Sequence, residues 1–285
     1  MKITEALSSR MTLSFEVFPP KMDKPIEPLM HTLSRLYELS PDFISCTYGA
    51  GGTNKGRQSE ILAAIKADGK TEPLAHFTCV GNTKEDIDRS LGEYLELGVE
   101  NMLALRGDLP ENWQGTRGDF AHADSLTAYL NGKHPELCLG GACYMEKHLQ
   151  AATFAEDIAH LRDKQANGAA FFITQLCHDV SVYERFMERL TKAGVTAPVI
   201  VGVMPVLKKD PIIRMTLMNG CSIPARLAAL IGRYGEDPEA FREAGKAYTV
   251  DEVRRYQAVG AAGLHFYSMN NYTDITDIIH GAGIR

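Results

Sequence analysis

The stretch Thr12-Leu-Ser-Phe-Glu-Val-Phe-Pro-Pro20 indicates how this chain is built. Five of the seven residues before the prolines are β-branched, aromatic or leucine, a composition typical of a strand. Pro19 and Pro20 end the strand, because proline donates no backbone hydrogen bond and restrains the residue before it. Glu16 lies within this apolar run. A buried carboxylate needs a partner or a raised pKa, so Glu16 is a candidate either for chemistry or for a structural ion pair.

The same strand pattern recurs along the chain and alternates with helical patterns. Further strands are predicted at 42–47, 73–79, 101–106, 137–144, 170–175, 198–204 and 263–267. Helices are predicted at 26–39, 57–67, 83–97, 121–131, 153–167, 181–193 and 273–281, with a longer helical stretch at 208–259.

This alternation predicts an α/β fold, a single (β/α)8 TIM barrel that spans residues 1–285 as one catalytic domain. An extra helical insertion is expected before the last strand, around 219–224 and 234–238. A doubly wound sheet is the alternative. Eight strand–helix units without a break in composition favour closure into a barrel.

The composition is that of an ordinary globular protein, with 45% hydrophobic residues, 23% charged residues and a formal net charge of −6. The absence of a dense Lys/Arg cluster argues against nucleic acid or an anionic membrane as the main partner. No apolar run approaches the roughly 20 residues of a membrane span, and the N-terminus lacks the apolar core of a signal peptide. The six scattered cysteines contain no Cys-x-x-Cys pair, so we expect a cytoplasmic protein without disulfides.

In a (β/α)8 barrel the active site lies at the carboxyl ends of the strands. Polar residues occupy such positions on seven predicted strands: Glu16, Thr47, Tyr48, His76, Thr78, Arg106, Asp108, Tyr144, His148, Gln175, His265 and Tyr267. Each has a structural explanation when taken singly, since His76 could be a core histidine and Arg106 with Asp108 an ion pair. Together they predict a site for a large polar ligand. No local spacing suggests the three or four converging ligands of a metal site.

The glycines at 49, 51 and 52 could let the backbone approach a ligand. They lack the strand–glycine–helix fingerprint of a dinucleotide site, so they equally suit a flexible loop.

Several motifs together resemble the methylenetetrahydrofolate reductase family, in family order from residue 12 to the end. They are Phe15-Glu-Val-Phe-Pro-Pro20, Thr47-Tyr-Gly-Ala-Gly-Gly52, His76-Phe-Thr-Cys79, Ala104-Leu-Arg-Gly-Asp-Leu-Pro110, Ile173-Thr-Gln175 and His265-Phe-Tyr267. The resemblance implies that an FAD-bound barrel reduces 5,10-methylenetetrahydrofolate to 5-methyltetrahydrofolate, with NADH or NADPH as the hydride source. The chain looks like the bacterial form that has only the catalytic domain, and family relatives are commonly homo-oligomers.

The resemblance also implies residue roles. Glu16 matches the general acid that protonates N10 of the folate and opens its five-membered ring to an iminium at N5. Asp108 matches the aspartate beside flavin and pterin, and Gln175 the glutamine that contacts folate and nicotinamide. Matches to flavin-contacting positions are Thr47, Tyr48, Ala50, His76, Arg106, Gly107, Asp108, Ala123, Tyr144, His148, Ala151, Asp157, His160 and Lys164.

Some positions depart from the family pattern. His160 and Asp163 stand where bacterial relatives often carry an Asn and an Arg that help to hold FAD. Pro211 and Asn271 stand where relatives have a Gln and an Arg that touch folate, and residues 54–58 also differ. The residues matched to the general acid and to hydride transfer are unchanged, whereas positions matched to contacts with FAD and with the folate differ. This pattern is compatible with a changed electron donor.

Two other hypotheses therefore stay open. The chain could be a flavin-carrying electron-transfer subunit that needs a partner redox protein as donor. It could also be a different barrel enzyme, such as a proline-dehydrogenase-like oxidase.

Overall fold

The computed structural model describes residues 1–48, 55–110 and 112–284, and their side chains except at 55 and 56. Within this part of the chain, eight parallel strands close into one barrel in sequence order, so that the last strand pairs with the first. The strands are β1 (Thr12–Val17), β2 (Phe43–Cys46), β3 (Glu72–Thr78), β4 (Asn101–Leu105), β5 (Cys138–Cys143), β6 (Ala169–Thr174), β7 (Val199–Val203) and β8 (Gly263–Tyr267). The predicted (β/α)8 barrel is confirmed.

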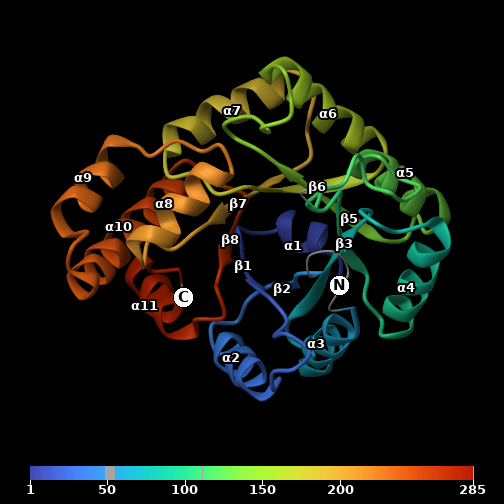
Figure 1. Cartoon of the computed structure of the whole chain (residues 1–285), viewed down its shortest axis with the longest axis horizontal. Helices are drawn as coiled ribbons and strands as arrows, with labels where there is room; N and C mark the ends of the chain where they lie inside the picture. Colours follow the sequence, from blue (N-terminus) through green and yellow to red (C-terminus); the bar gives the residue numbers. More distant parts are fainter. Residues whose placement is uncertain (49–54, 111, 285) are drawn as a thin grey trace.

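Helices surround the barrel on its outside (Figure 1). Those that follow β1 to β6 and β8 are α2 (Glu27–Tyr37), α3 (Lys55–Asp68), α4 (Lys84–Glu96), α5 (Ala123–Lys133), α6 (Phe154–Ala166), α7 (Val180–Lys192) and α11 (Tyr272–Ala282). Their ends differ from the predicted ends by two residues or fewer. Local signals explain this agreement, as at α4, where Thr83 and Asp86 form a reciprocal capping box.

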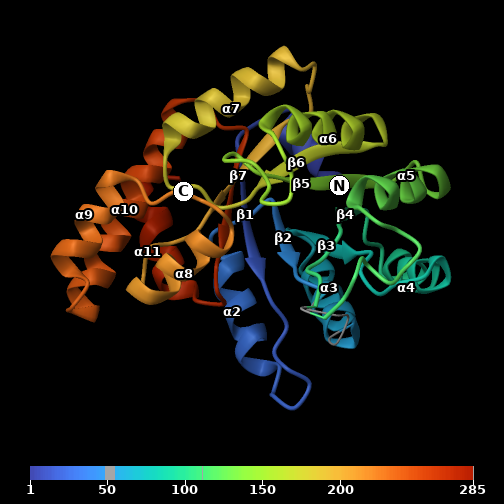
Figure 2. The same ribbon diagram turned by 45° about the horizontal axis from the view of Figure 1, so that its top comes forward.

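The predicted helical insertion between β7 and β8 is confirmed as three helices, α8 (Lys209–Met218), α9 (Ala225–Tyr234) and α10 (Pro238–Ala258). They gather on one side of the barrel together with α11 (Figures 1 and 2). Gly245 lets α10 approach the segment after β7 closely, because a Cβ at this position would lie 1.8 Å from the carbonyl oxygen of Val206. Thr249 Oγ1 then accepts a 3.1 Å hydrogen bond from the backbone N–H of Val206.

A short helix that the sequence patterns did not predict, α1 (Ile3–Leu7), covers the amino-terminal end of the barrel. It lies at the centre of the ring of strands in Figure 1. Ile3 packs inside the barrel with Phe43, Leu74 and Leu103, and its backbone N–H donates to Asn101 Oδ1 at 2.9 Å. A helix of five residues is too short to show a helical repeat of apolar residues, which is why the sequence did not predict it.

Side chains alternate between the two faces of each strand. On β1, Leu13, Phe15 and Val17 belong to the large apolar core between strands and helices. Ser14 and Glu16 face the other way, into the barrel, where Glu16 is level with Ser45 on β2 and Tyr267 on β8. The apolar neighbours of Glu16 in the sequence are therefore its outward-facing neighbours, while the interior around it is polar.

All six cysteines lie in the described part of the chain, where they are buried and unbridged. The barrel is thus held by packing and backbone hydrogen bonds. None of the described helices has the length and apolar character needed to cross a bilayer.

Candidate active site

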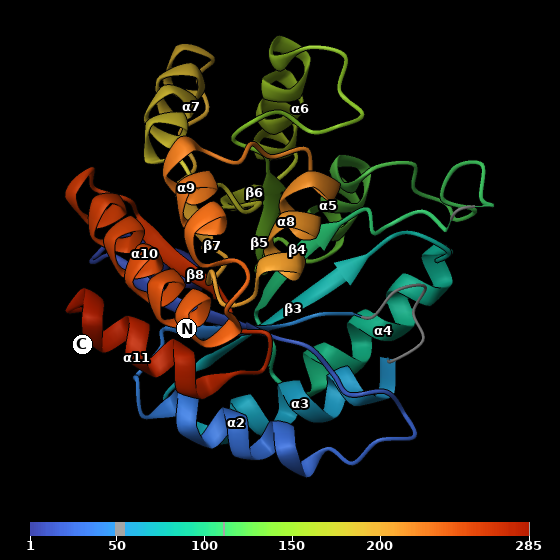
Figure 3. The same ribbon diagram turned by 60° about the vertical axis from the view of Figure 1, so that its left-hand side comes forward.

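Side chains at the carboxyl ends of the strands line a cavity of about 850 Å³, within the range of roughly 300–1,000 Å³ common for small-molecule sites. The loops after β1 and β4 extend on the same side of the barrel (Figure 3). Glu16 and Gln175 line the cavity. So do all the described residues predicted to contact flavin: Thr47, Tyr48, His76, Arg106, Gly107, Asp108, Ala123, Tyr144, His148, Ala151, Asp157, His160 and Lys164. Residues far apart in sequence are thus brought to one hollow, while their individual roles remain predictions.

A few predicted positions lie elsewhere. Ala50 falls outside the described residues. Asn271 does not belong to the cavity lining; its side chain caps α11, accepting from the backbone N–H of Asp274 at 3.3 Å and donating to that carboxylate at 2.6 Å. Asp163 is an exposed residue of α6, 3.9 Å from Arg162, and is likewise not in the lining.

Glu16 lies where the barrel interior meets the cavity, with one fifth of its side chain accessible. Burial raises the pKa of its carboxyl group from 4.5 to about 7. Its position is fixed through the backbone, because the Ser268 hydroxyl donates to the Glu16 carbonyl oxygen at 2.5 Å. A carboxylic acid that holds its proton near neutral pH can act as a general acid.

Two neutral histidines lie near Glu16. His76 Nε2 is 3.5 Å from Glu16 Oε2 and has no hydrogen-bond partner among the described residues. His265 is held by the hydroxyls of Ser14, at 2.8 Å, and Ser45, at 3.3 Å. Burial lowers the pKa of His76 to about 4 and that of His265 to about 3. Neither imidazole supplies a positive charge at neutral pH, so neither lowers the pKa of Glu16 by attraction.

Tyr267 forms part of the wall beside Glu16. Its hydroxyl donates to the Thr174 carbonyl oxygen at 2.7 Å. Gly202 makes this possible, because a Cβ there would lie 2.5 Å from the Tyr267 hydroxyl oxygen and 2.3 Å from the Thr174 carbonyl oxygen. The sequence analysis did not single out Gly202. A glycine in an apolar strand has no evident role until the residue that packs against it, here Tyr267, is known.

Gln175 follows β6, and both ends of its amide are engaged. Its Nε2 donates to Asn219 Oδ1 at 2.9 Å, and its Oε1 accepts from the backbone N–H of Leu176 at 2.8 Å. Asn219 lines the cavity at the end of α8 and was not among the predicted site residues. The only sequence signal was its place in the predicted insertion.

The opposite wall comes from β4, β5 and the loop after β5. Arg106 donates from Nη1 to Gln150 Oε1, which links the two strands' loops across the rim. The ring of Tyr144 meets that of His148 edge to face at 4.5 Å. The backbone N–H of His148 donates to Asp157 Oδ2 at 2.9 Å, which ties this loop to α6. The result is a braced surface of aromatic and cationic groups.

Gly107 lies between the predicted residues Arg106 and Asp108, with a φ of +88°. A Cβ there would lie 2.9 Å from Val80 Cγ1 and 3.2 Å from Thr78 Cβ. Both its backbone angle and its surroundings therefore require glycine, which gives the Leu-Arg-Gly-Asp motif a structural reason.

From α6 the cavity receives one lysine and one histidine as well as two carboxylates, Glu156 and Asp157. Lys164 lines the cavity and donates to the Ala142 carbonyl oxygen at 2.9 Å, and burial lowers the pKa of its ammonium group. His160 lines the cavity one turn earlier on the same helix. With Arg106 on the other side, the cavity offers cationic or hydrogen-bonding groups for phosphates and a partly apolar floor for a ring system. These groups fit a flavin dinucleotide.

The sequence comparison decides the family. The sequence pattern of the family described as methylenetetrahydrofolate reductase matches residues 2–283. The chain belongs to the methylenetetrahydrofolate reductase family. One cavity in this member is lined by Glu16, Arg106, Gly107, Asp108 and Gln175, the residues that the sequence analysis matched to this family.

Individual relatives support this membership. Methylenetetrahydrofolate reductase 1 of Schizosaccharomyces pombe is 32% identical over 100% of this chain, which spans about half (49%) of that protein. The 5,10-methylenetetrahydrofolate reductases of Pectobacterium carotovorum and Escherichia coli are each 30% identical over 98% of this chain, and the match covers 92% and 93% of their lengths. The match thus covers nearly the whole length of the bacterial proteins but only about half of the yeast protein.

Among solved structures, an uncharacterised Clostridium thermocellum protein described as binding two copies of 5-methyl-5,6,7,8-tetrahydrofolic acid has a TM-score of 0.69. Its identity to this chain is 16%, and the match covers 98% of this chain and 97% of that one. At this identity the similarity shows that the two proteins share a fold.

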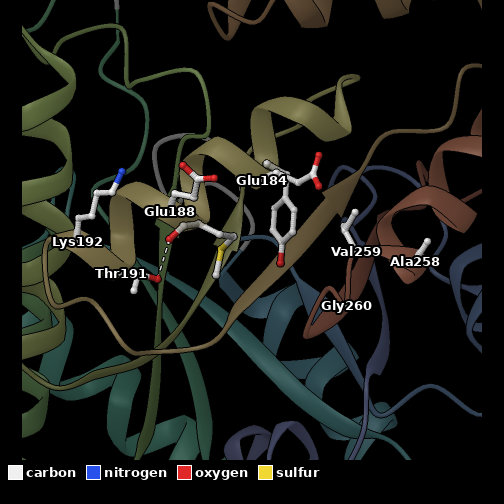
Figure 4. A pocket seen from close by; sticks show the side chains of 9 residues that line it. Glu184, Glu188, Thr191, Lys192, Ala258, Val259 and Gly260 are labelled. Atoms are coloured by element: carbon white, nitrogen blue, oxygen red, sulfur yellow. Dashed lines mark hydrogen bonds between the residues drawn. The ribbon is translucent and has the colours of Figure 1, made fainter.

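A second hollow, of about 690 Å³, lies outside the barrel between α7 and the end of α10 (Figure 4). Its lining includes Glu184, Glu188 and Lys192 from α7 and Val259 after α10. None of the family motifs contributes to it. The cavity at the carboxyl ends of the strands is therefore the one we take as the active site of this family member.

Proposed function

We propose that this protein reduces 5,10-methylenetetrahydrofolate to 5-methyltetrahydrofolate with FAD as cofactor and NADH or NADPH as electron donor. One observation carries the proposal: Glu16, a carboxylic acid with a pKa of about 7, lines a large cavity of mixed polar and apolar character in a barrel of this family. The bacterial relatives named 5,10-methylenetetrahydrofolate reductase, which this chain matches over nearly their whole length, support it.

Glu16 is the proposed general acid. The five-membered ring of the substrate opens when its N10 accepts a proton, which breaks the bond between N10 and the bridging carbon and leaves an iminium at N5. A pKa of about 7 means that about half of the Glu16 side chains carry the required proton at neutral pH. An ordinary glutamic acid, at 4.5, would be almost entirely ionised.

FAD would supply the hydride that converts the iminium carbon into the methyl group. Lys164, His160 and Arg106 would hold its anionic part, and Tyr144 and His148 would flank its rings. Asp108 would then adjoin both flavin and folate, where its carboxylate can accept hydrogen bonds from a pterin ring. The wall opposite, with Gln175, would orient the folate.

The decisive experiment is an anaerobic absorbance titration of the purified protein. We expect a yellow protein that bleaches with NADH or NADPH and recolours when methylenetetrahydrofolate is added. A flavoprotein that never recolours with a folate would overturn the proposal and would favour a different barrel enzyme. A colourless protein that cannot be loaded with FAD would overturn the cofactor assignment.

A second candidate function is a flavin-carrying electron-transfer subunit that takes electrons from a partner redox protein. Exposed apolar side chains in the last turn of α8 and on the segments after β1, β5 and β8 favour it: Phe18, Met22, Leu149, Leu217, Met218 and Met269. The same titration separates the two functions. A yellow protein that ignores NADH and NADPH, yet recolours with the folate after chemical reduction, would establish the need for a partner. The expected cytoplasmic location and homo-oligomeric state remain predictions.

A further inference from the structure

The amide of Gln175 is held between two backbone groups through a chain of hydrogen bonds. At one end, the Met215 carbonyl oxygen accepts from Asn219 Nδ2 at 2.8 Å. In the middle, Asn219 Oδ1 accepts from Gln175 Nε2 at 2.9 Å. At the other end, the backbone N–H of Leu176 donates to Gln175 Oε1 at 2.8 Å.

This chain leaves no freedom for either amide to turn over. A carbonyl oxygen can only accept and a backbone N–H can only donate. Met215 therefore requires the amino group of Asn219, which directs the Asn219 oxygen at Gln175. That oxygen requires the amino group of Gln175, and Leu176 requires the Gln175 oxygen. The orientation of the Gln175 amide follows from two backbone groups and is independent of any ligand.

The segment that carries Asn219 is itself braced. The backbone N–H of Cys221 donates to the Thr216 carbonyl oxygen at 2.9 Å, and Cys221 Sγ lies 3.0 Å from the Leu176 carbonyl oxygen. The backbone N–H of Ser222 donates to Glu146 Oε2 at 2.9 Å. The insertion is thereby fastened to the loops after both β5 and β6, which keeps Asn219 in place against Gln175.

We propose that Asn219 is a positioning residue that fixes the Gln175 amide and thereby makes the site selective for ligands that offer it an acceptor and a donor in one set order. This inference rests on the proposed function, because it assumes that Gln175 contacts the pterin. Two hydrogen bonds are already used within the protein, so one N–H and one oxygen lone pair of Gln175 remain for a ligand. A pterin lactam and a nicotinamide carboxamide both carry a carbonyl and an N–H, so one fixed amide could serve both ligands in turn.

Folic acid and aminopterin form a matched pair of probes for this idea. Replacing the 4-oxo group by an amino group turns an acceptor into a donor and the neighbouring N3 from a donor into an acceptor. The unaltered protein should bind aminopterin less tightly than folic acid, because the fixed Gln175 amide cannot turn to match the exchanged donor and acceptor. In Asn219→Ala the Gln175 amide keeps only the bond from the Leu176 N–H, so turning over to meet the reversed ligand costs one hydrogen bond instead of two.

The experiment measures dissociation constants of both probes by isothermal titration calorimetry on the FAD-loaded protein. We expect unaltered protein to prefer folic acid and Asn219→Ala to lower that preference about tenfold, the scale of one mismatched buried hydrogen bond. Asn219→Asp keeps an acceptor facing Gln175 and should retain most of the preference. Asn167→Ala serves as the control, because Asn167 also ends a helix, α6, but lies outside the cavity lining.

A second comparison tests whether Asn219 acts through Gln175. In a Gln175→Ala background, Asn219→Ala should leave the ratio of the two dissociation constants unchanged, because the two residues form one unit. Thermal melting of each variant reports any loss of folding separately.

The outcomes are distinct. If unaltered protein binds neither probe, the proposed folate activity fails and this inference fails with it. If it binds folic acid but Asn219→Ala keeps the full preference, or the two substitutions act additively, the positioning role is wrong while the proposed function stands.

Discussion

The two halves of the barrel interior differ in what they contain. The amino-terminal half is apolar, with Leu74 and Phe171 packed beneath α1. The carboxyl-terminal half holds Glu16, His76 and Gln175 around the cavity. On β3 the change from one half to the other takes two residues, from Leu74 to His76, a distance of about 6.6 Å along a strand. The two halves share Leu103 and Ile173 but otherwise rest on different residues, so mutation of the unshared residues should separate packing from chemistry.

The largest expected effect is on chemistry alone. Glu16→Gln removes the transferable proton but keeps the shape of the side chain. Reduction of the flavin by pyridine nucleotide should be nearly unchanged, while the folate half-reaction slows by about 10²–10⁴-fold. Stopped-flow absorbance of the two half-reactions measures both. If the folate half-reaction keeps its rate, Glu16 is not the general acid.

A substitution in the other half should affect stability alone. Leu74→Ala leaves a cavity in the fully buried interior, which we expect to lower the free energy of unfolding by about 3 kcal/mol. Denaturant titration measures this loss. The folate half-reaction of the molecules that remain folded should keep its rate, and a comparable loss of rate would mean that the two halves are coupled.

Glu16 should also give the stability a distinctive pH dependence. Its folded pKa, about 7, lies above its usual 4.5, so the folded state binds the proton more tightly than the unfolded state. The favourable contribution of Glu16 to the free energy of unfolding is therefore complete below about pH 4.5 and is lost as the pH rises to 7. The free energy of unfolding of Glu16→Gln, compared with that of the unaltered protein, should rise by on the order of 2 kcal/mol between pH 5 and pH 8. This figure allows for the partial exposure of the side chain. Denaturant titrations at both pH values test this, and an equal difference at the two would show that Glu16 is ionised throughout.

The smallest expected effect is at the boundary between the halves. Gly202→Ala places a methyl group against the Tyr267 hydroxyl and the Thr174 carbonyl oxygen, which should cost about 1–2 kcal/mol of unfolding free energy. The displaced Tyr267 ring should also weaken folate binding. Calorimetry with folic acid measures the change in folate binding. Gly132→Ala on α5, with no atom within 4 Å of the added Cβ and no left-handed φ, is the comparison for replacing a glycine without a clash. Unchanged folate binding would exclude Tyr267 as a support of the site.

The fold was predictable because its signals are local. Alternating strands and helices, each with its own end signals, repeat around the barrel, and a rim at the carboxyl ends follows from that topology. The cavity-lining residues were predictable because they lie in motifs next to strand ends. Contacts between distant segments left no such signal. Gly202 is explained only by Tyr267 across the barrel, Asn219 only by Gln175, and α1 only by the open end that it fills.

The pairing of β1 with β8 also bears on the order in which the protein is made. Residues 12–16 meet residues 263–267 in parallel register, and Asn270 adds hydrogen bonds to both the N–H and the carbonyl oxygen of Phe18, at 3.2 and 2.9 Å. Ser14 and its partner His265 are 251 positions apart in the chain. A ribosome therefore supplies β8 about 250 residues after β1. The wall that Tyr267 forms beside Glu16 is consequently completed only after the other seven strands have been made.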